Sequence, residues 1–218
     1  MDGFERTSTR ALVDRAGTNL VAIHYHFGSK EALYRAAAEH IGATILERNR
    51  AVVERGQALT ADANATRPEL VEAVCAIYDQ FATNVLSDSV RECWRSFIAR
   101  EQLQPSSTGA FEAMYTAISP LFTAAFGLVG RLLGLPAEHP EVRLLSMMIL
   151  GQASVFRTTR AGALRMLGWE KLGPEELREI RAVGRKYIVK LLAPPEEDAG
   201  RKGSRTPDDE PAQRALSF

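Results

Sequence analysis

Hydrophobic residues recur at three- and four-residue steps through most of the first 193 positions, and no segment shows the sustained alternation of a half-buried strand. This pattern predicts an all-α fold. We expect helices near residues 8–16, 20–26, 30–55, 68–86, 88–103, 109–133 with a bend near Pro120, 140–166 and 174–192. Pro68, Pro140 and Pro174 each precede a glutamate, and both residue types are favoured in the first turn of a helix.

Two other segments have distinctive patterns. Residues 113–130 carry no charge over 18 positions, but Tyr115, Ser119 and Pro120 interrupt them, so we expect a buried bundle helix rather than a membrane span. Residues 194–218 are rich in proline, glycine and charge and contain little that can be buried. They are expected to form a disordered tail.

The segment from residue 7 to residue 34 has the pattern of three short helices, each preceded by a residue that can cap it. The candidate caps are Thr7 or Ser8, Thr18 or Asn19, and Ser29. Gly17 can supply the positive φ of a tight turn, and two short helices joined by such a turn form a helix-turn-helix, whose second helix enters the DNA major groove. We expect the buried face to contain Leu12, Val13 and Ala16 on the first helix and Ile23 and Phe27 on the second.

The side chains that remain on the outer face suit contact with DNA. Hydroxyl, phenol, imidazole and ammonium groups are common donors to phosphate oxygens. The groups of this kind are Thr7, Ser8, Tyr25, His26 and Lys30. Small apolar side chains can contact thymine methyl groups, and amide or imidazole groups can bond base edges. The residues expected to face bases are Asn19, Leu20, Val21, Ala22 and His24.

Charge and composition narrow the alternatives. The net charge of the chain is zero, but residues 6–35 hold five basic and two acidic side chains, so affinity for DNA must come from this local excess. His24 and His26 are two residues apart and do not face each other on a helix, so we expect no metal site there. The two cysteines form no Cys-x-x-Cys pair, and the first residues contain no apolar signal segment, which indicates a reducing, cytoplasmic location.

We expect a binding protein rather than an enzyme, without a cofactor, because the sequence contains no nucleophile–base pair at usable spacing and no glycine-rich phosphate loop. Aromatic side chains on the middle helices, with a few polar ones, suit a pocket for a small amphipathic or aromatic effector. The candidate ligand-binding residues are Tyr78, Phe81, Trp94, Phe97, Tyr115, Phe122, Phe126, Gln152, Phe156 and Arg157. The alternative for each aromatic residue is an ordinary place in the core.

The last two long helices are apolar on more than one face. Residues 142–156 and the helix with Ile180, Tyr187 and Leu191 must therefore be covered on both sides. A four-helix interface between two copies of the chain would achieve this, and a monomeric core is the alternative.

The stretch "GFERTSTRALVDRAGTNLVAIHYHFGSKEALYRA" resembles the DNA-binding segment of the TetR family of bacterial transcriptional regulators. The resemblance implies an all-α homodimer, with a helix-turn-helix domain over residues 1–45 and a ligand-binding and dimerisation domain over residues 46–193. It also implies phosphate contacts from Thr7, Tyr25, His26 and Lys30. The expected function is a repressor that a small molecule releases from its DNA operator. "IHYHFGSK" and "LLSMMILGQASVFRTTRAGALRMLGW" are similar to the CecR-like subgroup.

Two departures from the family pattern matter. Thr18 stands where the family usually has a buried valine, and only Met1 and Asp2 precede Gly3, where the family has a whole helix. That helix normally covers positions such as Leu12 and Phe27. We therefore expect an N-terminally incomplete DNA-binding domain, through a start assigned too far downstream or a true truncation. The alternative function is a dimeric small-molecule-binding protein that has lost DNA binding.

Overall fold

The computed structural model of the protein describes residues 3–86 and 92–193, so the tail expected over residues 194–218 lies outside it. Within the described ranges the chain forms ten helices joined by turns, which confirms the predicted all-α class, although the hydrophobic pattern predicted eight helices and did not include residues 3–6. They are α1 (Gly3–Arg6), α2 (Thr9–Ala16), α3 (Leu20–Phe27), α4 (Lys30–Ala61), α5 (Arg67–Leu86), α6 (Glu92–Leu103), α7 (Ala110–Leu133), α8 (Pro140–Thr158), α9 (Arg160–Leu167) and α10 (Pro174–Leu191).

The predicted helix over 140–166 is wrong as a single element, because it is broken at Thr159 into α8 and α9. The hydroxyl of Thr159 donates to the Val155 carbonyl at 2.7 Å, and that of Thr158 donates to the Ser154 carbonyl at 3.2 Å. Threonine hydroxyls that bond to the preceding turn compete with the helical ladder and bend helices. Two adjacent threonines therefore end α8.

Helix α7 continues through Pro120, which lacks the N–H that would bond to the Thr116 carbonyl. The hydroxyl of Ser119 donates to that carbonyl at 2.9 Å and replaces the missing helical bond. Among the described residues, α7 has the length and apolar composition of a membrane-spanning helix. It packs against α4, α5 and α8 and buries residues along its length, which agrees with the expected bundle helix.

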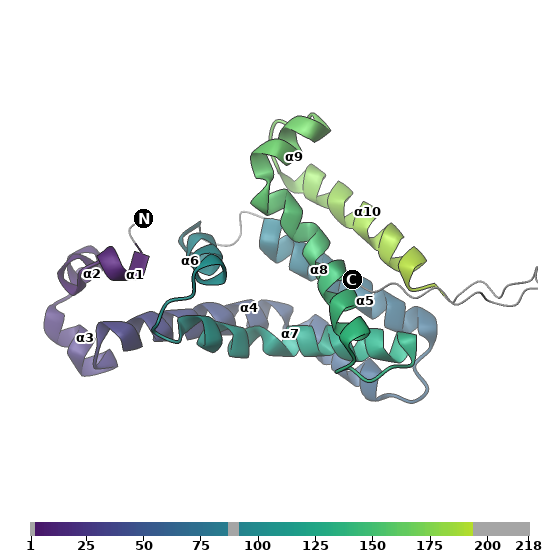
Figure 1. Ribbon diagram of the computed structural model, residues 1–218, viewed down its shortest axis with the longest axis horizontal. Coiled ribbons are helices and arrows are strands. Elements are labelled where there is room, and N and C mark those ends of the chain that lie inside the picture. Colours follow the sequence, from purple (N-terminus) through teal and green to yellow (C-terminus); the bar gives the residue numbers. More distant parts are fainter. Residues whose placement is uncertain (1–2, 87–91, 194–218) are drawn as a thin grey trace, which may run out of the picture.

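The long helices α4 and α7 lie along each other and connect the two ends of the molecule (Figure 1). Helices α1–α3 form one end, and α5, α8, α9 and α10 form the other. The main hydrophobic core lies at this second end, between α4, α5, α7, α8 and α10. Helix α10 is further tied to α5 by an ion pair between Arg185 and Asp79 at 2.8 Å.

A second, smaller core lies where α4, α6 and α7 meet, near the α1–α3 end. Ala38, Ala110 and Met114 form its buried centre, and Tyr34 and Phe97 pack against them. Helix α6 therefore lies between the α1–α3 end and the rest of the molecule.

Candidate nucleic-acid interface and ligand cavity

Side-chain caps hold the helices of the α1–α3 end in place. Helix α2 ends at Gly17, which has a φ of 63°, and the Thr18 N–H then bonds to the Val13 carbonyl at 3.0 Å. The Asn19 side chain accepts the Ala22 N–H at 3.0 Å and caps α3. Ser8 and Ser29 cap α2 and α4 in the same way, each at 3.1 Å. The predicted helix-turn-helix frame is therefore present, with Ser8 and Asn19 as the caps of its two helices.

Helix α3 presents most of its side chains to solvent. Tyr25 is 82% exposed and Val21 is 71% exposed, whereas Ile23 is buried against the neighbouring helices. The other candidate base-facing side chains, Leu20, His24 and Asn19, are also exposed, and Ala22 is half-buried. The outer face of α3 therefore contains the small, apolar and polar groups that the sequence placed there.

Two expected core positions of this end are exposed. Phe27 was predicted to be buried beside Ile23, but it is 41% exposed, and Ala16 is exposed as well. Helix α3 packs mainly against α2 and α4. Phe27 is the last residue of α3.

His24 has a bond that the sequence did not predict. Its Nδ1–H donates to the carbonyl of Gly28, which follows α3, at 3.0 Å. A donor at this end of a helix bonds to one of the carbonyls that lack a helical partner. This bond directs Nε2 away from the helix end and fixes the orientation of the ring. The neighbouring His26 packs with its ring edge-on to Tyr25, with centroids 5.0 Å apart.

The candidate phosphate-contacting residues lie around the same end. Lys30 begins α4 and places its ammonium group over the Phe4 ring, 4.2 Å from the centroid. The exposed Ser8 hydroxyl is already the acceptor of a helix cap, and Thr7 is half-buried beside it. Tyr25 and His26 are exposed near the end of α3, and Lys30 follows at the start of α4.

An aromatic chain connects this end to α6. Phe4 packs on Tyr34 with centroids 5.0 Å apart, and Tyr34 packs on Phe97 of α6 at 4.8 Å. The Tyr34 hydroxyl donates to the buried Glu101 carboxylate at 2.9 Å, and burial together with this bond raises the pKa of Tyr34 well above its usual range. Glu101 also accepts bonds from the N–H and hydroxyl of Ser106, each at 3.1 Å.

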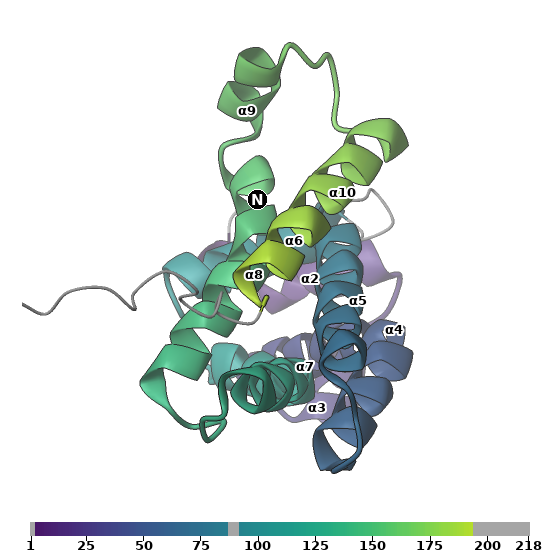
Figure 2. The ribbon, with the colours of Figure 1, turned by 90° about the vertical axis from the view of Figure 1, so that its right-hand side faces the viewer.

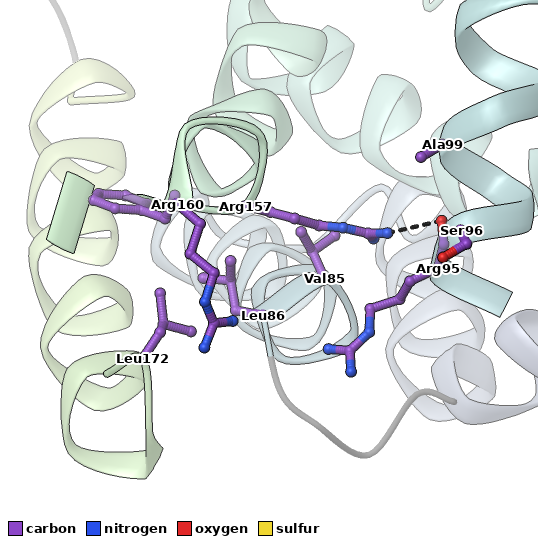
Figure 3. Close-up of a pocket in the computed structure, with 9 residues that line it drawn as sticks. Val85, Leu86, Arg95, Ser96, Ala99, Arg157, Arg160 and Leu172 are labelled. Carbon is purple, nitrogen blue, oxygen red and sulfur yellow. Dashed lines mark hydrogen bonds between the residues drawn. The ribbon is translucent and has the colours of Figure 1, made fainter. Parts of the chain in front are cut away.

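The opposite face of α6 lines a cavity of about 500 Å³ (Figure 3). Helix α5 contributes Val85 and Leu86, and the segment before α10 contributes Leu172. The polar lining consists of Arg95 and Ser96 from α6, Arg157 from α8 and Arg160 from α9. The Arg157 guanidinium spans the cavity and donates to the Arg95 carbonyl at 3.0 Å.

The ten candidate ligand-binding residues are not gathered in one place. Phe156 and Arg157 line this cavity. Phe97 packs on Tyr34, and Trp94 packs edge-on against His40 with centroids 5.8 Å apart. Phe81, Phe122 and Phe126 pack against the main core, Tyr78 is buried in it, and Tyr115 stacks between Phe111 and Phe122. The Gln152 amide donates to the Ile149 carbonyl of its own helix at 2.8 Å.

The sequence interpretation missed Arg95, Ser96 and Arg160. Arg157 and Arg160 flank the Thr-Thr pair at which α8 ends, and two arginines at such a break were the available signal. Nothing in the local pattern of α6 places Arg95 beside them, because that proximity depends on how α6 packs.

Helices α8 and α10 lie side by side (Figure 2), and each has apolar side chains that the described part of the chain leaves exposed. On α8, Leu144 is 64% exposed and Met148 is 71% exposed, and the exposed Gly151 lies one turn further along. On α10, Tyr187 and Leu191 are exposed, while Ile180 and Ile188 are buried in the core. Both helices therefore pack on the core with one side and present apolar residues with the other, as the sequence predicted.

Comparison with known proteins agrees with this architecture. Residues 2–37 match the family described as bacterial regulatory proteins, tetR family, and residues 70–193 match the C-terminal domain of the HTH-type transcriptional dual regulator CecR. The chain is 30% identical over 186 residues to the HTH-type transcriptional dual regulator CecR of Shigella flexneri, which covers 85% of this chain and 82% of that protein.

The fold is also similar to that of a solved structure, the transcriptional regulator FadR from Bacillus subtilis in complex with stearoyl-CoA. The TM-score is 0.50 at 14% identity, over 88% of this chain and 89% of FadR, and this likeness concerns the fold alone. The N-terminal helix-turn-helix and the match of more than half of the chain to a CecR domain together define the family. The chain belongs to the TetR family of bacterial transcriptional regulators, in the group that contains CecR.

Proposed function

We propose that this regulator is a homodimeric repressor that binds an operator through α3 and leaves it when a small molecule binds the C-terminal region. The observation that carries the proposal is the outer face of α3, which is exposed on a frame held by the Ser8, Asn19 and Ser29 caps. Residues 1–45 are proposed as the DNA-binding domain and residues 46–193 as the ligand-binding and dimerisation domain. Helix α4 is continuous across this proposed boundary. Action on chromosomal DNA implies a cytoplasmic location.

The proposed contacts follow from the chemistry of the exposed groups. Asn19 lies at the start of α3, the part of a recognition helix that reaches base edges. Its amide can bond to adenine, and Val21 can contact a thymine methyl group. Tyr25, His26 and Lys30 supply phosphate contacts, which fix the position of α3 in the groove without reading sequence.

Helix α6 offers a path from a bound small molecule to α3. Phe97 and Glu101 contact Tyr34 of the DNA-binding domain, while Arg95, Ser96 and Ala99 line the cavity on the other side of the same helix. A ligand that shifts α6 must either move Tyr34 or break its bond to the buried Glu101 carboxylate. The change in DNA affinity that such a ligand causes cannot exceed the ratio of its own affinities for the shifted and unshifted states.

A charge substitution at Asn19 tests the DNA-binding proposal without removing the cap. Aspartate caps helices as well as asparagine does, so Asn19→Asp should fold with unchanged stability. It places a negative charge toward DNA and loses the amide donors, so its affinity for operator DNA should fall by at least about tenfold, as expected for a lost base contact. The measurement is fluorescence anisotropy with duplexes tiled over the DNA upstream of the coding sequence.

Asn64→Asp is the matched control, because it makes the same change on an exposed loop between α4 and α5. It should bind DNA as the parent protein does.

The affinity of the parent protein for operator DNA should also fall steeply with added salt, because phosphate contacts release counterions. The proposal fails if no duplex binds at low salt, and the dimeric small-molecule-binding protein is then the better account. It also fails if Asn19→Asp and Asn64→Asp bind equally well.

A further inference from the structure

The cavity between α5, α6, α8 and α9 brings together three arginines from different helices. Arg95, Arg157 and Arg160 line it. Figure 3 shows Arg157 crossing the cavity, with the side chains of Arg95 and Arg160 extending on the same side of it. Arg157 and Arg95 are half-buried, so their charges lie partly out of water.

Three guanidinium groups in one small cavity favour a bound anion. Arginine stays charged at any physiological pH, and its planar fork of N–H donors matches the two oxygens of a carboxylate or a phosphate. A guanidinium that is partly withdrawn from water interacts with an anion more strongly than an exposed one does. The bond from Arg157 to the Arg95 carbonyl fixes one of the three groups at the cavity wall.

Apart from Ser96, the rest of the wall is apolar. Leu86, Phe156 and Leu172 face the same space, and Val85 and Ala99 complete it. A volume of about 500 Å³ lies within the usual range of ligand sites. A ligand that satisfies both parts of the wall must carry a charged end and an apolar body.

We propose that this cavity binds the effector, and that the effector is an amphipathic anion. Its carboxylate or phosphate group contacts Arg95, Arg157 and Arg160, and its apolar body packs on Phe156 and Leu172. The inference rests on the proposed regulation by a small molecule and adds the chemical class of that molecule. Because α6 supplies Arg95 on one face and Phe97 on the other, an anion that draws Arg95 inward also pulls on the contact with Tyr34.

The first experiment compares three probes that share a ten-carbon chain: decanoate, decyl phosphate and decan-1-ol. Binding to the full-length protein is measured by titration calorimetry, below the concentrations at which the probes form micelles. At least one anion should bind at least about tenfold more tightly than the alcohol, as expected for a charged hydrogen bond. The preferred anion then identifies the head group as carboxylate or phosphate. Equal or weaker binding of both anions, or no binding by any of the three, overturns the proposal.

The second experiment removes one charge from the cavity. Arg160 is exposed at the first position of α9, so Arg160→Gln should fold normally, and its affinity for the preferred anion should fall by about tenfold. Arg165→Gln is the matched control, since it removes the same charge from the same helix outside the cavity. If the two variants bind the anion equally well, the arginine site is wrong. If Arg160→Gln does not fold, the test is the salt dependence of anion binding by the parent protein. An affinity that does not fall with added salt contradicts the proposal.

DNA binding separates this inference from the proposed function. If the parent protein binds its operator but neither anion, the inference fails and the repressor remains. If an anion binds the parent protein, not Arg160→Gln, and leaves DNA affinity unchanged, the site is real but the proposed release from DNA is wrong. The two proposals stand together when the same anion releases DNA from the parent protein and fails to release it from Arg160→Gln.

Discussion

At the scale of single residues, Tyr78 shows how a polar aromatic group is held inside the main core. Its ring is buried and lies directly against Gly184 of α10, where an added Cβ would come within 2.2 Å of the Tyr78 hydroxyl. That hydroxyl donates to the Ile180 carbonyl at 3.4 Å. Burial raises the pKa of Tyr78 to about 12. The residue is part of the α5–α10 contact and does not line the arginine cavity.

This environment predicts a loss of stability at alkaline pH. An unfolded tyrosine ionises near pH 10, about two pKa units below the folded value, so its contribution to stability is complete below pH 10 and falls as the pH rises toward 12. The expected loss is about 2–3 kcal/mol. Urea unfolding of the parent protein and Tyr78→Phe should give free energies within about 1 kcal/mol at pH 8, since only a weak hydrogen bond is lost. Above pH 10 the free energy of unfolding should fall less for Tyr78→Phe than for the parent protein. If the two free energies fall in parallel, Tyr78 is not a buried neutral phenol.

The capping residues were predictable from sequence, whereas Tyr78 was not. Ser8, Gly17 and Asn19 act on neighbours within a few positions, so their roles follow from local pattern. Whether Tyr78 lines a pocket or fills the core depends on Gly184, more than a hundred residues away in the chain. His24 is intermediate, because it is exposed as the pattern suggested, but its local bond to the Gly28 carbonyl was not predicted.

At the scale of helices, the close approach of α4 and α7 determines the shape of the molecule. A Cβ added at Gly42 of α4 would lie 2.6 Å from the Cβ of Ala117 and 3.0 Å from the Met114 carbonyl oxygen, both on α7. The neighbouring small residue Ala38 is also fully buried against this region. The absence of a side chain at Gly42 therefore lets the two backbones meet near the DNA-binding end.

We expect Gly42→Ala to destabilise the protein by about 1–3 kcal/mol, because overpacking forces the helices apart. Gly162→Ala is the control, since nothing lies within 4 Å of its Cβ position on α9. Alanine favours helix over glycine by up to about 1 kcal/mol, so this variant should be as stable as the parent or slightly more so. Urea unfolding followed by circular dichroism measures both. A Gly42→Ala protein as stable as Gly162→Ala would show that α4 and α7 do not pack as described.

Helix boundaries were predicted well where a cap or a proline sets them, and less well where side-chain bonds do. The start of α10 after Gly173 follows from its proline, and the end of α2 follows from Gly17. The break at Thr159 depends on hydroxyl bonds to the preceding turn, which hydrophobic periodicity does not reveal. The arginine cavity combines four elements, and only its Phe156 and Arg157 part was predicted from the local pattern of α8.

At the scale of the whole molecule, the exposed apolar side chains of α8 and α10 predict a surface that binds a partner. Leu144, Met147 and Met148 on α8 and Tyr187 and Leu191 on α10 are all about half-exposed or more, and the two helices pack against each other. Exposed apolar side chains on neighbouring helices are typical of an interaction surface. A second copy of the chain, related by a two-fold axis, would cover it with the same residues and form a four-helix interface. Such a pair would hold two α3 helices for successive major grooves, which lie roughly 34–36 Å apart.

This arrangement predicts that a single charge introduced on the shared face both separates the subunits and abolishes operator binding. Met148→Glu would place a carboxylate in the proposed interface twice, once per subunit, and would also remove two methionines that the proposed dimer buries, worth about 1.5–3 kcal/mol each. The dissociation constant of the dimer should therefore rise by at least about a hundredfold. Size-exclusion chromatography with light scattering measures the mass, and anisotropy with operator DNA measures binding. Met166→Glu is the matched control, because Met166 is 86% exposed on α9, outside this face. A Met148→Glu protein that stays dimeric would place the interface elsewhere, and a monomer that still binds operator tightly would show that the two α3 helices act independently.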